Sequence, residues 1–271
     1  MMKTFDLGHS NHLVYDYQPP ADGGVTFTFF NALSGGADMW TGESIGGALR
    51  ASGHGLCVFN MRGQADTGYA SMLSQDHNPV VEDALALMRE VAPVRPVYVG
   101  LSIGGLFAAL VHLGGAPAVG LALINTLRKD GPRLSWINAA VTQAARVGGP
   151  ALLMDLYAPM LFAEPWLAAN RASALDAQAY VPADETTGAF MLLASGGSAS
   201  WDVPWDRIQV PTLVLTGLRD RVFYVEDDVD NISSRMAAAT RVNFDDAGHL
   251  IPIEQPAALA RELLSLATRC D

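Results

Sequence analysis

The stretch Val97-Tyr98-Val99-Gly100-Leu101-Ser102-Ile103-Gly104-Gly105 determines how the rest of the chain is arranged. Residues 97–99 are typical of a buried strand, and the apolar run 106–113 is typical of a helix. Between them stands Gly-x-Ser-x-Gly, centred on Ser102. This order predicts a sharp turn between strand and helix, with the serine hydroxyl raised above the sheet. Because isolated patterns of this kind also occur in ordinary glycine-rich turns, the rest of the chain has to decide its meaning.

Strands and helices alternate on both sides of this stretch. Such alternation predicts an α/β fold, with a mostly parallel sheet covered by helices on both faces. The predicted strands are two short ones within 1–18, then 25–30, 56–59, 97–100, 119–124, 210–217 and 241–244. The predicted helices between them are about 40–51, then 78–91, 106–113 and 256–268.

The alternation stops between residues 125 and 205. This region contains amphipathic helical pieces, interrupted at Gly148-Gly149-Pro150 and at Pro165, and a further helix is predicted from Pro182 to Leu192. We therefore expect a core formed by 1–124 and 206–271, and a helical cap formed by 125–205 after the sixth strand. Such an insertion is expected over the carboxyl edge of the sheet, where open α/β sheets bind ligands.

Composition excludes several classes of partner. The chain has 271 residues, 50% of them hydrophobic, and a formal net charge of −11. This charge argues against nucleic acid and against anionic membrane surfaces as partners. The partner expected from the motifs described below is a small molecule with an apolar portion. Cys57 and Cys270 suggest no disulfide framework, and the start of the chain lacks an apolar signal run, so we expect a cytoplasmic protein. The oligomeric state stays open.

No cofactor is expected from the motifs. The sequence has no Gly-x-Gly-x-x-Gly and no phosphate-binding loop, so no nucleotide is implied. The histidines outside the pattern described below have no partners at the spacing of metal ligands; they are His9, His12, His54, His77 and His112. We therefore predict neither a metal nor an organic cofactor.

Two later loops supply the partners that a serine nucleophile requires. Asp220 comes just after the strand 210–217, and His249 lies in the loop after the last strand. A histidine can take the serine proton, and an acid can orient that histidine. Ser102, Asp220 and His249 occur in the order Ser…Asp…His, and each follows a predicted strand, so all three should meet at one edge of the sheet.

Other acids could replace Asp220. Asp245 and Asp246 are close to His249 in sequence, which favours a local contact over an orienting role. The remaining alternatives are Asp227 and Asp228, and Asp220 could instead cap the following helix or pair with Arg219 or Arg221.

Two backbone N–H groups are needed to stabilise the oxyanion that such a reaction forms. The first is expected from Ile103, directly after the serine, and the second from Leu33, in the loop after the strand 25–30. The cap aromatics could either pack cap against core or line an apolar acyl pocket; they are Trp136, Tyr157, Phe162 and Trp166.

The chain resembles the α/β-hydrolase superfamily, and within it the small capped enzymes that include enol-lactonases, carboxylesterases and non-haem haloperoxidase-like proteins. The resemblance covers nearly the whole chain and implies a mostly parallel eight-stranded sheet. The matching segments are Gly100–Gly105, Met61-Arg62-Gly63, Gly217-Leu218-Arg219-Asp220, and Ala247-Gly248-His249 followed by Glu254-Gln255-Pro256. A serine at the elbow is unlike the aspartate of the dehalogenase and epoxide hydrolase branches.

The chain departs from the family pattern in two places. Asn31-Ala32 stands where the family usually has His-Gly, and Asn60 stands where an aspartate is usual. After Arg62-Gly63, the segment 64–67 (Gln-Ala-Asp-Thr) replaces the usual second glycine and serine. Neither change removes a catalytic atom, because the oxyanion donors are backbone groups.

The resemblance and the three residues together predict a serine hydrolase that cleaves a small or medium ester, lactone or thioester through an acyl-enzyme. A C–C bond hydrolase or an acyltransferase on the same residues is an alternative, as is a ligand-binding protein on a hydrolase scaffold. A C–C hydrolase would need a basic residue for a substrate carboxylate, and Arg62, Arg128 and Arg133 are candidates that the sequence does not distinguish.

Overall fold

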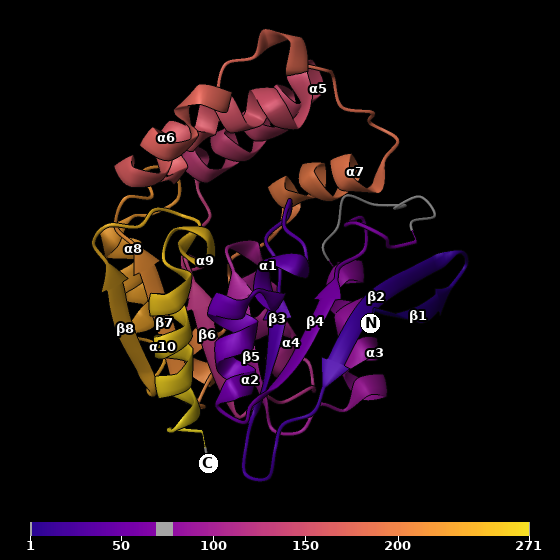
Figure 1. The fold of residues 1–271 in the computed structure, drawn as a ribbon, viewed down its shortest axis with the longest axis vertical. Coiled ribbons are helices and arrows are strands. Elements are labelled where there is room, and N and C mark those ends of the chain that lie inside the picture. Colours follow the sequence, from indigo (N-terminus) through magenta and orange to yellow (C-terminus); the bar gives the residue numbers. More distant parts are fainter. Residues whose placement is uncertain (1, 69–77, 271) are drawn as a thin grey trace.

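The computed structural model describes residues 2–68 and 78–270. Its centre is an eight-stranded sheet with the order β1-β2-β4-β3-β5-β6-β7-β8 (Figure 1). The strands are β1 (Lys3–Gly8), β2 (Asn11–Gln18), β3 (Thr26–Phe30), β4 (Gly55–Asn60), β5 (Pro96–Leu101), β6 (Gly120–Ile124), β7 (Thr212–Gly217) and β8 (Ala239–Phe244). β2 is antiparallel to both β1 and β4, and the strands from β3 to β8 are parallel. The predicted fold class is confirmed.

Helices cover both faces of the sheet. One face carries α1 (Asp38–Thr41), α2 (Ala48–Ala51) and α10 (Pro256–Ala267), and the other carries α3 (Asn78–Val91), α4 (Ile103–Leu113) and α8 (Glu226–Ser233). Successive side chains of a strand point to opposite faces. Phe29 of β3 accordingly packs in the first layer, against Trp40 of α1, while Phe30 packs in the second. This two-sided core explains why the parallel strands read as continuous apolar runs.

The helix predicted at about 40–51 is divided into three pieces. A π-helical turn, η1 (Glu43–Gly47), separates α1 from α2. Gly42 has φ −60° and ψ 161°, so its extended backbone ends α1 before the next turn begins. The expectation of one continuous helix was therefore wrong.

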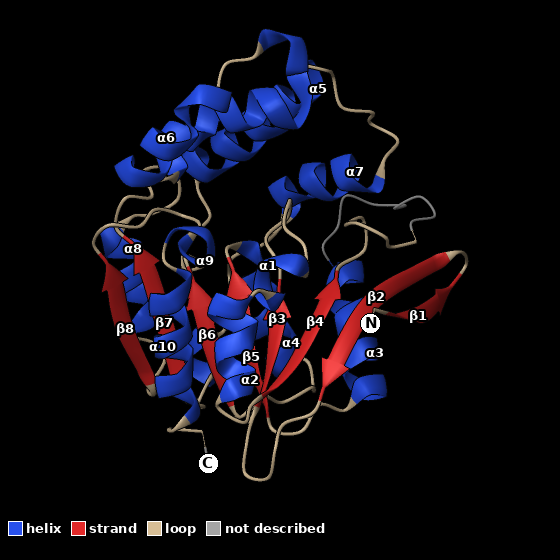
Figure 2. Cartoon of the chain, in the orientation of Figure 1, coloured by secondary structure: helices blue, strands red, loops and turns tan. Residues whose placement is uncertain are grey.

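The region between β6 and β7 is helical and lies over the carboxyl ends of the parallel strands (Figure 2). It contains α5 (Pro132–Leu161), α6 (Glu164–Asn170) and α7 (Gly188–Ser195). α5 is broken where a break was predicted, with Gly149 at φ +65°. α7 begins later than the predicted Pro182, because Thr187 accepts the N–H of Phe190 and caps the helix there.

Within residues 2–68 and 78–270, no helix combines the length and the apolar character needed to cross a membrane. Cys57 and Cys270 are buried free thiols. Burial raises the pKa of the Cys57 thiol to about 12.

Candidate active site

Ser102 occupies a sharp turn between β5 and α4. Its backbone has φ 57° and ψ −122°, a region that non-glycine residues rarely adopt. The turn is held by its own N–H, which donates to the carbonyl of Ile124 on β6 at 2.8 Å. A Cβ at Gly104 would collide with the carbonyl of Phe30, so only glycine lets β3 approach the start of α4 this closely.

Asp220 and His249 are brought into contact from two separate loops. Asp220 Oδ2 lies 2.6 Å from His249 Nδ1, and both side chains are buried. Oδ1 of Asp220 accepts the backbone N–H groups of Val222 at 3.0 Å and Phe223 at 2.9 Å. Since a carboxylate only accepts, His249 Nδ1 carries the proton, and Nε2 is the acceptor of the neutral ring.

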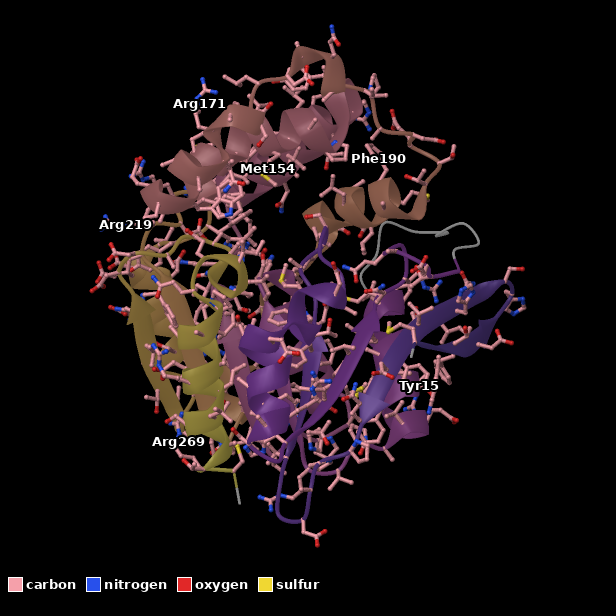
Figure 3. The ribbon with its side chains drawn as sticks, in the orientation of Figure 1. Tyr15, Met154, Arg171, Phe190, Arg219 and Arg269 are labelled. Atoms are coloured by element: carbon pink, nitrogen blue, oxygen red, sulfur yellow. The ribbon has the colours of Figure 1, made fainter. Side chains whose placement is uncertain are left out.

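The environment of Asp220 favours its charged form. Burial alone would raise the pKa of this carboxyl, but the charge and hydrogen bond of His249, the N–H of Phe223 and the nearby charge of Arg128 hold it below its ordinary value. The carboxyl is therefore an anion at neutral pH, as an orienting partner for an imidazole requires. Asp245 and Asp246 are exposed instead, and Arg219 pairs with Asp246 at the periphery of the molecule (Figure 3).

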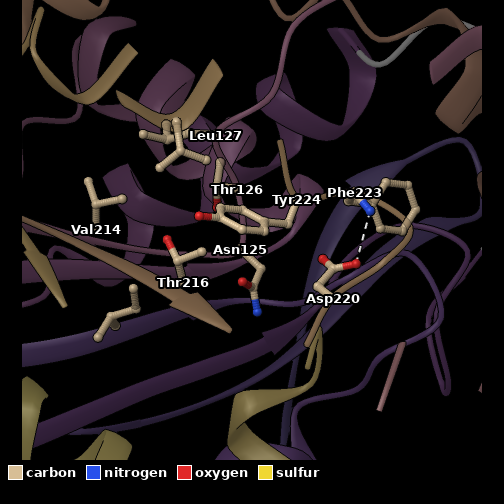
Figure 4. Close-up of a pocket in the computed structure, with 10 residues that line it drawn as sticks. Asn125, Thr126, Leu127, Val214, Thr216, Asp220, Phe223 and Tyr224 are labelled. Carbon is tan, nitrogen blue, oxygen red and sulfur yellow. Dashed lines mark hydrogen bonds between the residues drawn. The ribbon is translucent and has the colours of Figure 1, made fainter. Parts of the chain in front are cut away.

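A small cavity lies behind Asp220 (Figure 4). Its volume of about 10 Å³ is close to that of a single water probe, so it is too small for a substrate. Asn125 lines it together with Thr126, Phe223 and Tyr224. The dashed line in the figure is the bond from the Phe223 N–H to Asp220.

Asn125, which sequence reasoning did not single out, connects the loops that carry Asp220 and His249. Its Nδ2 donates to the carbonyls of Gly248 at 3.1 Å and His249 at 2.8 Å, and its Oδ1 accepts the N–H of Gly217 at 2.8 Å. The side chain thus holds the ends of β6, β7 and β8 in one arrangement. An asparagine directly after a buried strand was the available signal.

Ser102 and His249 are not hydrogen-bonded to each other among the described residues. Within the described part of the chain, His249 Nε2 has no hydrogen-bond partner, and the partner of Ser102 Oγ is Arg128 Nη2, at 3.1 Å. Bonds of this kind are often formed only once substrate is present.

Arg128 differs from the other two candidate arginines in its burial and in its contacts. It is buried, and its guanidinium lies 4.5 Å from the ring centre of Trp201 and 4.4 Å from that of Phe223. Arg62 is instead held by both oxygens of Asp83, each at 2.7 Å. Arg133 is exposed, and among the described residues its side chain reaches the carbonyl of Arg221, at 3.5 Å.

The loop carrying Leu33 lies beside the start of α4 and is held by side chains from the two departures noted above. Asn31 Nδ2 donates to Gln64 Oε1 at 2.9 Å, and Gln64 Nε2 donates to the carbonyls of Ala32 at 2.7 Å and Leu33 at 3.2 Å. Trp40 Nε1 donates to Asn31 Oδ1 at 2.7 Å. Asn31 and Gln64, two residues that depart from the family pattern, are thus hydrogen-bonded to each other.

Ile103, the other expected oxyanion donor, is the first residue of α4. Backbone N–H groups at the start of a helix have no partner within the helix.

The four cap aromatics lie in different places. Trp136 is 80% exposed and lines a surface pocket with Tyr157, while Phe162 and Trp166 stack on each other with ring centres 3.7 Å apart. Phe162 follows Leu161, whose carbonyl accepts the backbone N–H of His249. The part of the cap in contact with the His249 loop is therefore the end of α5.

No group of three or more His, Cys, Asp or Glu side chains among the described residues could hold a metal ion. His77 lies outside those residues.

Comparison with known proteins defines the class of the chain. Residues 29–262 match the alpha/beta hydrolase family, so the chain belongs to this family and is a hydrolase. No curated protein matches the sequence.

Solved structures share the fold at low sequence identity. An alpha/beta hydrolase enzyme from a Medee basin deep-sea metagenome library has a TM-score of 0.84 at 15% identity, covering 99% of this chain and 98% of that one. The enol-lactonase from Burkholderia xenovorans has a TM-score of 0.76 at 19% identity, covering 96% and 98%. A thermophilic esterase from Thermogutta terrifontis has a TM-score of 0.72 at 20% identity, covering 98% of both chains.

Proposed function

We propose that this hydrolase cleaves a small or medium carboxylic ester, lactone or thioester through an acyl-enzyme formed on Ser102. The observation that carries the proposal is the buried pair of Asp220 and His249, 2.6 Å apart, at the same sheet edge as a serine on a strained strand-to-helix turn. The esterase and enol-lactonase among the structural relatives support this class of substrate.

The reaction follows from these positions. Ser102 Oγ attacks the substrate carbonyl carbon while its proton passes to His249 Nε2, and Asp220 stabilises the imidazolium that forms. The carbonyl oxygen becomes an oxyanion, which accepts hydrogen bonds from the N–H groups of Ile103 and Leu33. The C–O or C–S bond then breaks, and His249 returns the proton to the leaving alkoxide or thiolate.

Water completes the cycle. His249 takes a proton from a water molecule as the water oxygen attacks the acyl carbon, and the proton returns to Ser102 Oγ when the acid leaves. No step requires a metal or an organic cofactor.

We further propose that α5, α6 and α7 act as a lid on this site. The backbone bond between Leu161 and His249 supports this role, because it joins the end of α5 to the proposed base. Closing such a lid would exclude water from the acyl pocket.

Labelling with a fluorophosphonate tests the proposal. We expect one adduct on the wild-type protein by intact mass, and none on Ser102→Ala, because the reagent reacts with activated serines. A folded wild-type protein that takes no adduct would contradict it and favour the ligand-binding alternative. If the adduct forms, hydrolysis rates on panels of esters, lactones and thioesters would show which of these substrate classes the enzyme cleaves.

A further inference from the structure

The hydrogen bonds of Arg128 leave one side of its guanidinium unused. Nε donates to the carbonyl of Thr126 at 3.1 Å, and Nη2 donates to the carbonyl of Asn125 at 2.7 Å and to Ser102 Oγ at 3.1 Å. A guanidinium has five N–H donors, and these bonds use three of them. Among the described residues, nothing accepts from Nη1.

No acidic side chain of the described chain forms an ion pair with Arg128. Asp220 is the acid whose charge it feels, but the oxygens of that carboxylate are occupied by His249, Val222 and Phe223. Burial lowers the pKa of Arg128 to about 10, which leaves the side chain charged at neutral pH. A buried cation without an anionic partner is costly, so this residue is not explained by stability.

Two aromatic rings fix the position of this cation. Trp201, from the segment between α7 and β7, and Phe223, from the loop after β7, each contact the guanidinium carbon at about the distance of a cation–π interaction. These contacts hold the plane of the group but accept none of its N–H bonds. The indole N–H of Trp201 is itself buried without a hydrogen-bond partner among the described residues, so a second donor in this place lacks an acceptor.

We propose that Arg128 binds a carboxylate of the substrate, and that the ester or lactone cleaved by this enzyme is therefore an acid. The proposal rests on the function proposed above and specifies its substrate class. Arg128 Nη2 is 3.1 Å from Ser102 Oγ, so a carboxylate on this guanidinium lies close to the carbonyl carbon that Ser102 attacks. The geometry fits a carboxylate roughly two or three carbon atoms from the scissile carbonyl, because reacting atoms approach to about 3 Å.

Binding to an inactive variant tests this proposal independently of turnover. We would titrate succinate and, as a neutral match of similar shape, succinamide into Ser102→Ala by calorimetry. We expect succinate to bind at least about tenfold more tightly, because an ion pair with a desolvated guanidinium strengthens binding. Equal affinity for the two compounds, or no binding of either, would overturn the proposal.

Kinetics separate a binding role from general electrostatic assistance. For Arg128→Gln, we expect kcat/KM for monomethyl succinate to fall about 100-fold further than that for the neutral methyl 4-methylpentanoate. Arg261→Gln, an exposed residue on α10, is the matched control and should leave both values unchanged. An equal loss on both esters would contradict the proposal, because it would place Arg128 in steps common to all substrates.

Fluorophosphonate labelling distinguishes the two possible failures. The reagent carries no carboxylate, so Arg128→Gln should still be labelled at Ser102, which also reports that the variant is folded. Labelling without discrimination between acid and neutral esters would refute the role of Arg128 alone. Absence of labelling on the wild-type protein would refute the proposed function itself.

Discussion

At the scale of single residues, Asp220 shows how burial and hydrogen bonding oppose each other. The carboxyl lies in the protein interior, where desolvation favours its neutral form, yet its bonds to His249 and to the Phe223 N–H keep it charged. The carboxylate of Asp220 therefore holds the imidazole of His249 by a hydrogen bond, and the same bond helps to keep the carboxylate charged.

This balance predicts a pH-dependent stability difference. Because the folded pKa of Asp220 is below its unfolded value, its contribution to stability is fully present above the unfolded pKa of 3.8 and is lost as the pH falls through the folded pKa. We expect the stability advantage of the wild-type protein over Asp220→Asn to shrink between about pH 5 and about pH 2.5, measured by urea unfolding. An advantage that grows over this interval would contradict the direction of the pKa shift.

Arg128 shows where residue-level prediction ends. The sequence presents Arg62, Arg128 and Arg133 as equivalent candidates, and what separates them is their distant partners. Arg62 forms an ion pair with Asp83 of α3, whereas the guanidinium of Arg128 packs against the ring of Trp201. Contacts between residues so far apart in the chain leave no periodic signal.

At the scale of elements, local sequence patterns predict the positions of most strands, but they do not predict features that depend on contacts between loops. Alternating strand and helix patterns specify β3 to β8, because each parallel strand is buried on both faces and reads as an apolar run. The start of α7 was misjudged, since Thr187 rather than Pro182 provides the cap. The loop after β3 could not be built from sequence, because side chains of another loop hold it.

The position of the loop after β3 depends on the side chain of Gln64, which a substitution can test. Replacing it with alanine removes the donor for the carbonyls of Ala32 and Leu33. It also removes one acceptor of Asn31 Nδ2, which keeps its bond to the carbonyl of Phe59 at 2.9 Å. We expect Gln64→Ala to lower kcat about 10- to 100-fold with a smaller change in KM, because the proposed oxyanion donor at Leu33 loses its position.

The matched control for this variant is Gln178→Ala, whose side chain is exposed in the cap. A Gln64→Ala enzyme that raises KM at unchanged kcat would argue that the loop binds substrate and does not stabilise the oxyanion.

At the scale of the whole molecule, one carboxylate joins the helical region between β6 and β7 to the loop that carries His249. Glu254, at the end of α9 (Ile251–Glu254), accepts the N–H of Gly248 at 2.8 Å with one oxygen and the N–H of Ala163 at 2.7 Å with the other. The position of the cap and that of His249 are therefore coupled. This coupling could not be predicted, although the sequence Glu254-Gln255-Pro256 is part of the family resemblance.

Removal of the Glu254 carboxylate should make the backbone around Ala163 and around Gly248 more mobile. For Glu254→Ala, we expect faster hydrogen exchange at residues 161–163 and 248–249, and a loss of about 1–3 kcal/mol in the free energy of unfolding. The exposed Glu90 on α3 provides the control variant, Glu90→Ala. Unchanged exchange at both sites would show that Glu254 does not hold the cap.

The most direct test of the central claim is to trap the acyl-enzyme. Wild-type protein would be mixed with 4-nitrophenyl acetate, quenched within milliseconds, and digested for peptide mass mapping. We expect a burst of nitrophenol close to one per active site and an acetyl group on the peptide that contains Ser102, both absent in Ser102→Ala. Hydrolysis that continues in Ser102→Ala, or an acetyl group found on another residue, would contradict it.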